Sequence, residues 1–172
     1  MERNINDVTD CESFEFPSLA LDANKFAPGG SLGNIRGVTA DNMNQFVEIR
    51  KSKKHGNGLF ALKDFKKGES LYTLKKGRIV KHDEIQNLSE LEKIHLDQIG
   101  KDEYEIIEPP GCCINHSCDP NVQEKDRTGY ALKDIKKDEE ITIDYDKIAY
   151  FEKPFECHCG SKNCRGFVRG RQ

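Results

Sequence analysis

Alternation between apolar and polar residues predicts several short strands in this chain. Residues 46–50, Phe-Val-Glu-Ile-Arg, alternate with the period of two that a half-buried strand shows. Residues 71–74 and 141–143 are shorter runs of apolar and β-branched residues, which also favour strands. Residues 141–145 together predict a short strand that ends in Tyr145. The pattern as a whole predicts a β-rich fold.

A nine-residue motif occurs twice. Ala-Leu-Lys-Asp-Phe-Lys-Lys-Gly-Glu at 61–69 returns as Ala-Leu-Lys-Asp-Ile-Lys-Lys-Asp-Glu at 131–139. Each copy leads into one of the apolar runs above, and its Lys-Lys-Gly/Asp-Glu core predicts a tight turn between strands. Two copies are too few for a solenoid, which needs at least three stacked units. The fold is therefore expected to contain two similar strand–turn–strand elements.

One amphipathic helix is predicted over residues 81–94. Its apolar residues recur every three positions and form one stripe: Ile85, Leu88, Leu91 and Ile94. Core packing explains that stripe. The Pro-Pro-Gly run at 109–111 interrupts the chain before an Asn-His turn, and the tail from residue 147 onward is expected to be irregular.

Composition narrows the class of protein. The 172 residues suit one domain, and 27 basic against 30 acidic residues give a net charge of −3, so direct nucleic-acid binding is not expected. No apolar run reaches the roughly 20 residues of a membrane helix, and the N-terminus lacks a signal-like segment. We expect an intracellular, cytoplasmic protein. Action in the nucleus, or in a host cell into which the protein is delivered, is also compatible with the sequence. Seven cysteines in a reducing compartment favour metal binding over disulfides.

Three cysteines within eight residues predict a zinc site. They are Cys157, Cys159 and Cys164. Tetrahedral closure needs a fourth ligand, for which Cys118 in the Ser-Cys-Asp-Pro turn is the first choice. Other candidates for the fourth position are Cys112, Cys113 and His158. Four thiolates leave no open coordination position, so the zinc is expected to be structural.

Three other features point to a pocket. Two glycines flank Asn57 in the run Lys-His-Gly-Asn-Gly-Leu-Phe at 54–60, and glycine lets a backbone approach a ligand closely. The run is not a dinucleotide fingerprint, because no third glycine and no helix follow. The Asn115-His116 turn and Tyr145 complete the set, and a metal-anchored tail would fold over them.

Together these motifs resemble the SET-domain protein lysine methyltransferases that carry a post-SET zinc segment. The resemblance covers residues 45–168, with four motifs in the family's order: Gly-Asn-Gly-Leu-Phe-Ala at 56–61, Ile-Asn-His-Ser-Cys-Asp-Pro-Asn at 114–121, Glu-Glu-Ile-Thr-Ile-Asp-Tyr at 139–145, and the cysteine-rich tail. Cys11 is the only cysteine before Cys112, so the cysteine-rich pre-SET segment is missing. The layout looks more like the small stand-alone SET proteins of microbes.

The resemblance implies a mostly β fold with few short helices. The expected architecture is a β-clip-like arrangement of small sheets with a knot-like C-terminal crossing and a zinc-anchored tail. It divides the chain into an N-terminal extension of unknown role at 1–44, a SET catalytic domain at 45–146 and a post-SET segment at 147–172.

The resemblance also implies a reaction. S-adenosylmethionine would donate a methyl group to a lysine of a histone or another protein, and Tyr145 matches the family's catalytic tyrosine. No membrane partner is expected. The positions that match the family's cofactor-binding residues are His55, Gly56, Asn57, Gly58, Asn115, His116, Tyr145 and Phe167.

Two departures from the family concern the substrate channel. Residues 74–77, Leu-Lys-Lys-Gly, lack the aromatic residue that the family often places two positions before a glycine. His95 stands where a tyrosine is expected; His95 and Tyr104 are the candidate channel residues, although strand packing also explains Tyr104. These departures motivate an alternative, a SET-like module that holds cofactor or peptide without methylating.

Overall fold

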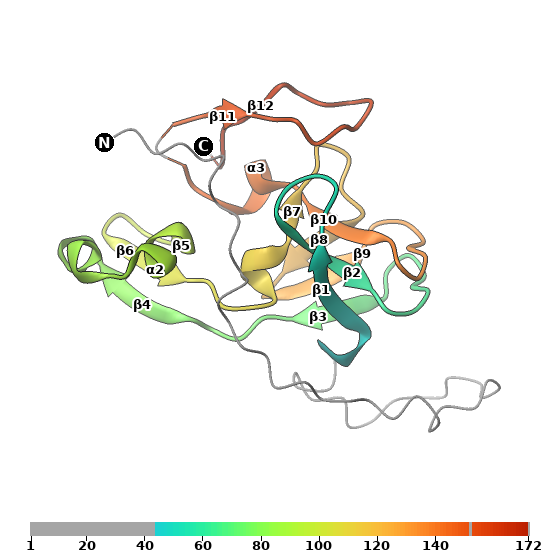
Figure 1. The fold of residues 1–172 in the computed structure, drawn as a ribbon, viewed down its shortest axis with the longest axis horizontal. Helices are drawn as coiled ribbons and strands as arrows, with labels where there is room; N and C mark the ends of the chain where they lie inside the picture. The colour runs from blue at the N-terminus through green and yellow to red at the C-terminus, as the bar shows by residue number, and fades with distance from the viewer. Residues whose placement is uncertain (1–43, 152, 172) are drawn as a thin grey trace.

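The computed structural model describes residues 44–151 and 153–171 and consists of small sheets (Figure 1). The predicted N-terminal extension lies, apart from Asn44, outside these residues. A four-stranded sheet has the order β1-β2-β10-β7, with β10 antiparallel to β2 and parallel to β7. Its strands are β1 (Val47–Lys51), β2 (Asn57–Ala61), β10 (Glu140–Ile143) and β7 (Asn115–His116). Segments far apart in the sequence therefore meet in one sheet.

Two three-stranded antiparallel sheets and one hairpin complete the β structure of the described residues. The first sheet orders β3 (Ser70–Thr73), β9 (Thr128–Ala131) and β8 (Val122–Lys125). The second orders β4 (Arg78–Lys81), β6 (Glu103–Ile106) and β5 (Leu96–Gln98), and lies to one side of the molecule in Figure 1. The hairpin pairs β11 (Phe155–Glu156) with β12 (Phe167–Val168).

The strand predictions are confirmed, because the alternating and apolar runs become β1, β3 and β10. The inward faces of the first two sheets form the main core, in which Leu59, Leu71 and Ile141 are fully buried. Burying an aliphatic side chain of this size contributes ~1.5–3 kcal/mol. None of the described helices has the length and apolar character needed to span a bilayer.

The two copies of the repeated motif pair with each other. Phe65 and Ile135 exchange both backbone hydrogen bonds, at 2.8 and 2.9 Å, and both side chains are buried. The ion pairs are reciprocal as well, and join Lys66 to Asp134 at 2.7 Å and Lys136 to Asp64 at 2.8 Å. Two nearly identical segments thus pair with each other, and each supplies the same contacts to the other.

The turn residue of each copy has the same backbone conformation. Gly68 has φ +88° and Asp138 has φ +67°, in the left-handed region that glycine adopts freely and aspartate tolerates. The Gly68 and Asp138 N–H groups donate to equivalent carbonyls, those of Ala131 and Ala61 respectively. The predicted tight turns are confirmed.

The prediction of one continuous helix over 81–94 is wrong. The segment is a 3₁₀ helix, η5 (His82–Asn87), followed by α2 (Glu90–Ile94). Between them Leu88 is extended, and Ser89 starts a new helix by a capping box: its hydroxyl accepts from the Glu92 N–H, and the Glu92 carboxylate accepts from the Ser89 N–H at 2.8 Å. Of the apolar stripe only Leu88 is buried.

The C-terminal tail is more regular than expected. Tyr145 begins a short helix, α3 (Tyr145–Ile148), instead of ending the strand, because Asp144 caps that helix by accepting a hydrogen bond from the Asp146 N–H. The β11–β12 hairpin then lies beside α3 in Figure 1. The remaining described elements are the 3₁₀ helices η4 (Asn44–Phe46) and η6 (Gly111–Cys113).

Candidate functional site

One asparagine side chain joins the 55–58 loop to the Asn-His turn. Asn115 lies on β7, and its Nδ2 donates to the backbone oxygens of His55 at 3.1 Å and Asn57 at 3.0 Å, and to Glu140 Oε1 at 2.8 Å. Two motifs that are nearly 60 residues apart in sequence are therefore held together. Gly56 within that loop has φ +47°.

Gly58 has a packing role in this loop. A Cβ at this position would lie 2.6 Å from Glu140 Oε1 and 3.1 Å from the Ser52 Cβ. The missing side chain thus makes room for the carboxylate that Asn115 also contacts. Close approach of the Glu140 side chain therefore requires a glycine at this position.

Both the side chain and the backbone of Tyr145 are held by hydrogen bonds. Its hydroxyl donates to the Ile114 carbonyl at 2.7 Å, and its backbone N–H donates to His116 Nδ1 at 3.2 Å. The rings of Tyr145 and His116 lie 5.3 Å apart. Burial raises the pKa of the Tyr145 phenol above its usual range, so the group is a neutral hydroxyl at physiological pH.

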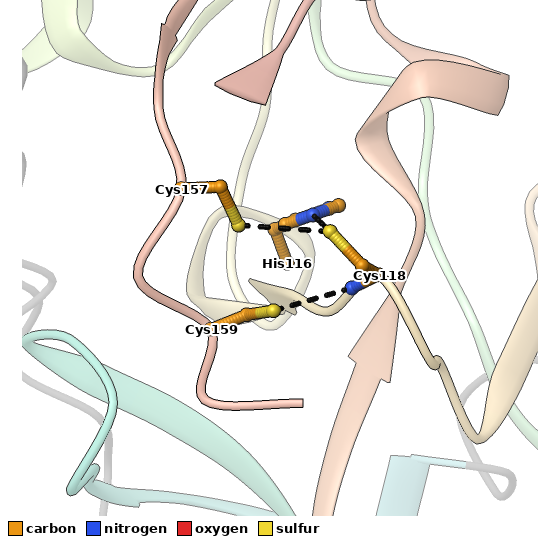
Figure 2. Close-up of side chains that lie close together, drawn as sticks. All are labelled: His116, Cys118, Cys157 and Cys159. Atoms are coloured by element: carbon orange, nitrogen blue, oxygen red, sulfur yellow. Dashed lines mark hydrogen bonds between the residues drawn. The ribbon is translucent and has the colours of Figure 1, made fainter. Parts of the chain in front are cut away.

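Four side chains converge beside Tyr145 on what would be a metal site (Figure 2). The ligand atoms of His116, Cys118, Cys157 and Cys159 all lie within 4.8 Å of one another. His116 Nε2 is 3.3 Å from Cys118 Sγ, and Cys118 Sγ is 3.7 Å from Cys157 Sγ. Backbone N–H groups point at two of the sulfurs, from Cys118 to Cys159 Sγ and from Arg165 to Cys118 Sγ. Thiol and imidazole donors at this density fit zinc.

Cys164, which the sequence predicts as a ligand together with Cys157 and Cys159, lies next to this group without being part of it. Its thiol donates to the Cys157 carbonyl at 3.3 Å. His116 is the fourth member of the converging group instead. Cys164 therefore stays a predicted ligand, and His116 is a donor that the sequence reasoning did not consider for the metal.

The other candidate ligands lie elsewhere. Burial raises the pKa of the Cys112 thiol to about 12, so it is a neutral thiol, and Cys113 is buried beside it in η6. His158 is exposed, with its Nε2 3.4 Å from a Glu156 carboxylate oxygen. None of the three belongs to the converging group.

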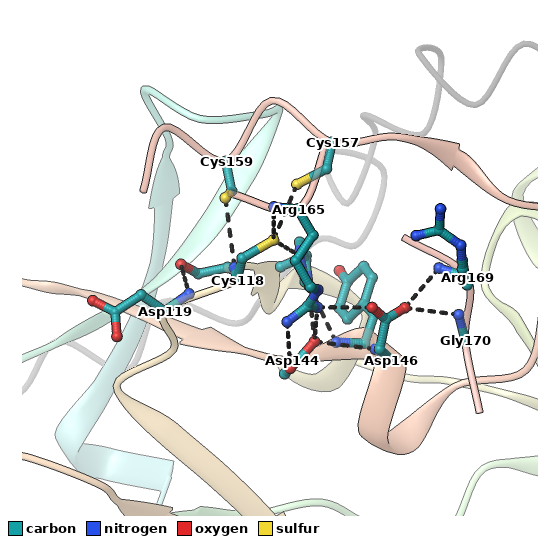
Figure 3. A network of polar contacts seen from close by, with 12 residues as sticks. Cys118, Asp119, Asp144, Asp146, Cys157, Cys159, Arg165, Arg169 and Gly170 are labelled. Atoms are coloured by element: carbon teal, nitrogen blue, oxygen red, sulfur yellow. Dashed lines mark hydrogen bonds and ion pairs between the residues drawn. The ribbon is translucent and has the colours of Figure 1, made fainter. Parts of the chain in front are cut away.

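A network that the sequence reasoning missed ties the tail to Tyr145 (Figure 3). Arg165 donates to both carboxylate oxygens of Asp144, at 3.1 and 2.6 Å, and pairs with Asp146 at 2.8 Å. The Asp146 carboxylate in turn accepts from the backbone N–H groups of Arg169 and Gly170. Asp144 and Asp146 flank Tyr145, so the cysteine-rich tail and the tyrosine are positioned by the same side chains.

Two more contacts involve the tail. Lys54 Nζ donates to the Cys159 carbonyl at 2.9 Å, which links the 55–58 loop to the cysteine group. Phe167 on β12 is 42% exposed, with the Arg169 guanidinium 5.7 Å from its ring centroid. The Phe167 ring is therefore exposed enough to contact a ligand.

Of the candidate channel residues, Tyr104 lies on β6 and His95 directly before β5, at the β4-β6-β5 sheet. Tyr104 packs against the apolar cluster of that sheet, and its hydroxyl is 3.3 Å from His82 Nδ1. His95 is buried at the end of α2, and burial lowers its pKa, so its ring is neutral. Gly77 is needed sterically, because a Cβ there would lie 1.9 Å from the Ile106 carbonyl oxygen. Within the described residues, the contacts of Tyr104 are with this sheet and with η5, and not with Tyr145.

A family model described as the SET domain matches residues 56–146, which is more than half of the 172 residues. The chain belongs to the SET-domain family. The match includes the 55–58 loop from Gly56 on, the Asn-His turn and Tyr145, so the residues that the structure brings together lie within this SET domain or directly after it.

Curated relatives of this SET domain include named histone-lysine methyltransferases. A protein of Aspergillus oryzae named histone-lysine N-methyltransferase, H3 lysine-36 specific, is 30% identical over 149 residues, covering 73% of this chain and 15% of that protein. The variant-silencing SET domain-containing protein of Plasmodium falciparum is 33% identical over 141 residues, covering 70% of this chain and 6% of that protein. Human histone-lysine N-methyltransferase SETD2 is 30% identical over 142 residues, covering 72% of this chain and 6% of that protein.

The chain therefore spans less than a fifth of the length of these relatives. Among solved structures, the methyltransferase domain of human histone-lysine N-methyltransferase SETMAR aligns with a TM-score of 0.53 at 21% identity, covering 73% of this chain and 58% of that one. This likeness supports the SET fold.

Proposed function

We propose that this SET domain transfers a methyl group from S-adenosylmethionine to the ε-amine of a lysine in a protein substrate. The observation that carries the proposal is the arrangement at Tyr145. Its neutral hydroxyl is fixed on the Ile114 carbonyl, directly before the Asn-His turn, and its backbone is fixed on His116. The curated relatives named as histone-lysine methyltransferases support the reaction class and make a histone one candidate substrate.

The residues present fit the cofactor. An adenosyl amino acid requires peptide groups and polar side chains for its charged end and an aromatic or apolar surface for its adenine. The 55–58 loop, held by Asn115, offers peptide groups for the charged end, and the exposed ring of Phe167 offers an aromatic surface for the adenine. His55, Gly56, Asn57 and Gly58, with Asn115, His116 and Phe167, are thus the residues that would hold it.

Tyr145 would orient the substrate amine. The cofactor supplies an electrophilic methyl group on a sulfonium when it is bound. The lysine must arrive as an uncharged amine, because only its lone pair can form the new bond to carbon. The Tyr145 hydroxyl and the Ile114 carbonyl are fixed polar groups that can align that amine, and such alignment is a large part of the rate gain in a transfer between two bound groups.

Zinc would order the tail over this site. Cys118, Cys157 and Cys159, with Cys164 or His116 as the fourth donor, would hold a structural ion that has no open position for substrate. Zinc would connect the tail that carries Phe167 to the Asn-His turn. Loss of metal is then expected to weaken cofactor binding by releasing the tail, without changing the chemistry at Tyr145.

The proposal is tested by methyl transfer with Tyr145→Phe. Zinc-loaded protein is incubated with radiolabelled S-adenosylmethionine and either core histones or cell lysate, and cofactor affinity is measured by calorimetry. We expect the variant to lose transfer by about a hundredfold or more, as removal of a group that acts in the transition state does, and to keep cofactor affinity. Tyr104→Phe is the matched control, because Tyr104 lies on β6 of another sheet and its hydroxyl contacts His82 in η5.

Equal transfer by the wild type and Tyr145→Phe would remove Tyr145 from the catalytic role. Cofactor binding by the wild type without transfer to any protein in histones or lysate would favour the alternative, a SET-like binding module.

A further inference from the structure

The C-terminal tail is basic, whereas the rest of the chain is acidic. Residues 147–172 contain six basic and two acidic side chains, a net charge of +4, so residues 1–146 carry −7 to give the total of −3. Zinc on its thiolates would lower the positive value only slightly. The expectation of no direct nucleic-acid binding rests on the net charge of the whole chain, which averages over this difference. A charge asymmetry of this kind favours an anionic partner for the tail.

Most of the cations in the tail have no acidic partner. Arg165 is the exception, since it pairs with Asp144 and Asp146. The Asp146 carboxylate also accepts hydrogen bonds from the backbone N–H groups of Arg169 and Gly170, as Figure 3 shows. The other basic side chains of the tail form no ion pair in the described ranges: Lys147, Lys153, Lys162, Arg169 and Arg171.

Two of these cations lie on one exposed face of the segment at 167–171. Burial alternates along this segment, so every second side chain points outward: Phe167, Arg169 and Arg171. The segment is held in place, because β12 pairs with β11 and the Arg171 N–H donates to the Ala149 carbonyl at 2.8 Å. Gly170 is required for this fit, since a Cβ there would lie 2.8 Å from the same carbonyl oxygen.

Each of the two arginines lies over an exposed aromatic ring. The Arg171 guanidinium is 5.3 Å from the ring centroid of Tyr150, and the Arg169 guanidinium is 5.7 Å from that of Phe167. The rings of Tyr150 and Phe167 are 41% and 42% exposed, and Ile99 is the one other large apolar side chain of similar exposure among the described residues. Stacking on a ring holds a guanidinium in place while its N–H donors stay free for a ligand.

Guanidinium groups beside exposed aromatic rings match the chemistry of a single-stranded nucleic acid. A planar guanidinium pairs with phosphate oxygens through two N–H donors. An aromatic ring stacks against an unpaired base. An acidic peptide would use the charges but not the rings, and the bases of a duplex are already stacked on one another. A single strand is therefore the partner that uses both parts of this surface.

We propose that Arg169, Arg171 and the Tyr150 ring form a binding surface for a single strand of RNA or DNA. The two guanidinium groups would contact phosphates, and the Tyr150 ring would stack on a base. Phe167 would hold Arg169 in place, and its ring stays assigned to the cofactor. The inference does not rest on the proposed methyl transfer, since binding a strand requires neither the cofactor nor Tyr145.

Binding is tested by fluorescence anisotropy with labelled single strands of DNA and RNA of one mixed sequence, about 12 nucleotides long. Zinc-loaded protein without cofactor is titrated at several salt concentrations. Each phosphate contact to a single strand contributes ~0.7 to the slope of log affinity against log salt concentration. The double variant Arg169→Gln, Arg171→Gln should therefore bind roughly tenfold more weakly, with a slope smaller by about 1.4.

The matched control is the double variant Lys67→Gln, Lys137→Gln. These lysines are exposed in the two repeated turns and form no ion pair in the part of the chain that the structure describes, so their replacement removes the same amount of charge. The control should keep the affinity and the salt dependence of the wild type. Equal losses in the two double variants would overturn the proposal, because binding would then follow net charge alone. Failure of the wild type to bind either strand would also overturn it.

Tyr150→Leu tests the ring without changing the charge. Leucine is apolar but cannot stack on a base, so the affinity should fall about fivefold or more while the salt dependence stays unchanged. The replaced side chain is exposed, so the variant is expected to melt at the temperature of the wild type. Wild-type affinity in this variant would remove the ring from the surface and overturn the proposal of a stacked base.

Two further probes separate a single strand from other anionic partners. A duplex of the same sequence and an oligo-glutamate peptide of similar charge should both bind more weakly than the single strands, because neither offers an unpaired base to Tyr150. Binding of the duplex that is as tight as that of the single strands would indicate a surface for double-stranded DNA. Tighter binding of the peptide would indicate a surface for an acidic protein, and either result would overturn the proposal.

Discussion

Replacing Arg165 by alanine tests whether its contacts with Asp144 and Asp146 attach the tail to the segment that contains Tyr145. Arg165 makes two hydrogen bonds to Asp144, whose side chain is 6% exposed, and pairs with Asp146. Hydrogen bonds to charged groups contribute ~1.5–3 kcal/mol. Arg165 is itself 36% exposed, so water screens part of this interaction. We expect Arg165→Ala to lower the free energy of unfolding by about 1–2 kcal/mol.

Arg50→Ala is a matched control for this measurement. Arg50 is 34% exposed and also pairs with two carboxylates, but those of Glu48 and Asp138 are 49% and 56% exposed. Exposed carboxylates stay hydrated when their partner is removed, so the expected loss is below about 1 kcal/mol. The two variants differ mainly in the burial of the carboxylate that is left behind.

Urea unfolding of zinc-loaded protein, followed by circular dichroism, measures both losses. The account also expects Arg165→Ala to lower methyl transfer, since Asp144 and Asp146 flank Tyr145, while Arg50→Ala leaves transfer unchanged. Equal losses of stability in the two variants would refute the reasoning that the burial of Asp144 sets the strength of this contact.

Three further predictions concern pH, the helix cap and the metal. Burial raises the pKa of the Asp97 carboxyl on β5 to about 6, so its contribution to stability is fully present below its unfolded pKa of about 4 and is lost as pH rises to about 6. The free energy of unfolding of Asp97→Asn, relative to that of the wild type, should therefore increase across that range. A difference that does not change with pH would contradict the raised pKa of Asp97. Ser89→Ala should cost ~1 kcal/mol in thermal unfolding, because it removes the capping box that starts α2; an unchanged melting temperature would show that the cap is dispensable. Removing zinc with a chelator should make the segment after residue 150 the first site of proteolysis, whereas cleavage within residues 57–143 first would contradict a structural role limited to the tail.

The strands and turns could be predicted because their signals are local. Alternation marks β1, apolar runs mark β3 and β10, and the repeated Lys-Lys-Gly/Asp-Glu marks two turns with the same positive φ. The helix over 81–94 was mispredicted because the apolar spacing continues through Leu88, while Ser89 and Glu92 restart the helix by a competing local interaction.

The site could be predicted only in its parts. Sequence motifs mark Asn115, Tyr145 and the cysteines, but not the pairing of Arg165 with Asp144, because ion pairs between residues 21 positions apart leave no periodic signal. The position of Tyr145 at the start of α3 depends on the Asp144 cap, for which the aspartate before the tyrosine was an available signal.

The most direct test of the central claim is the chemical identity of the methylated residue. Protein labelled by the wild type from radioactive S-adenosylmethionine is hydrolysed, and its amino acids are separated. The account predicts that the label co-migrates with ε-N-methylated lysine and is absent when Tyr145→Phe replaces the wild type. Label on another amino acid, or no label with zinc-loaded protein that binds the cofactor, would contradict the proposal that this SET domain is a protein lysine methyltransferase.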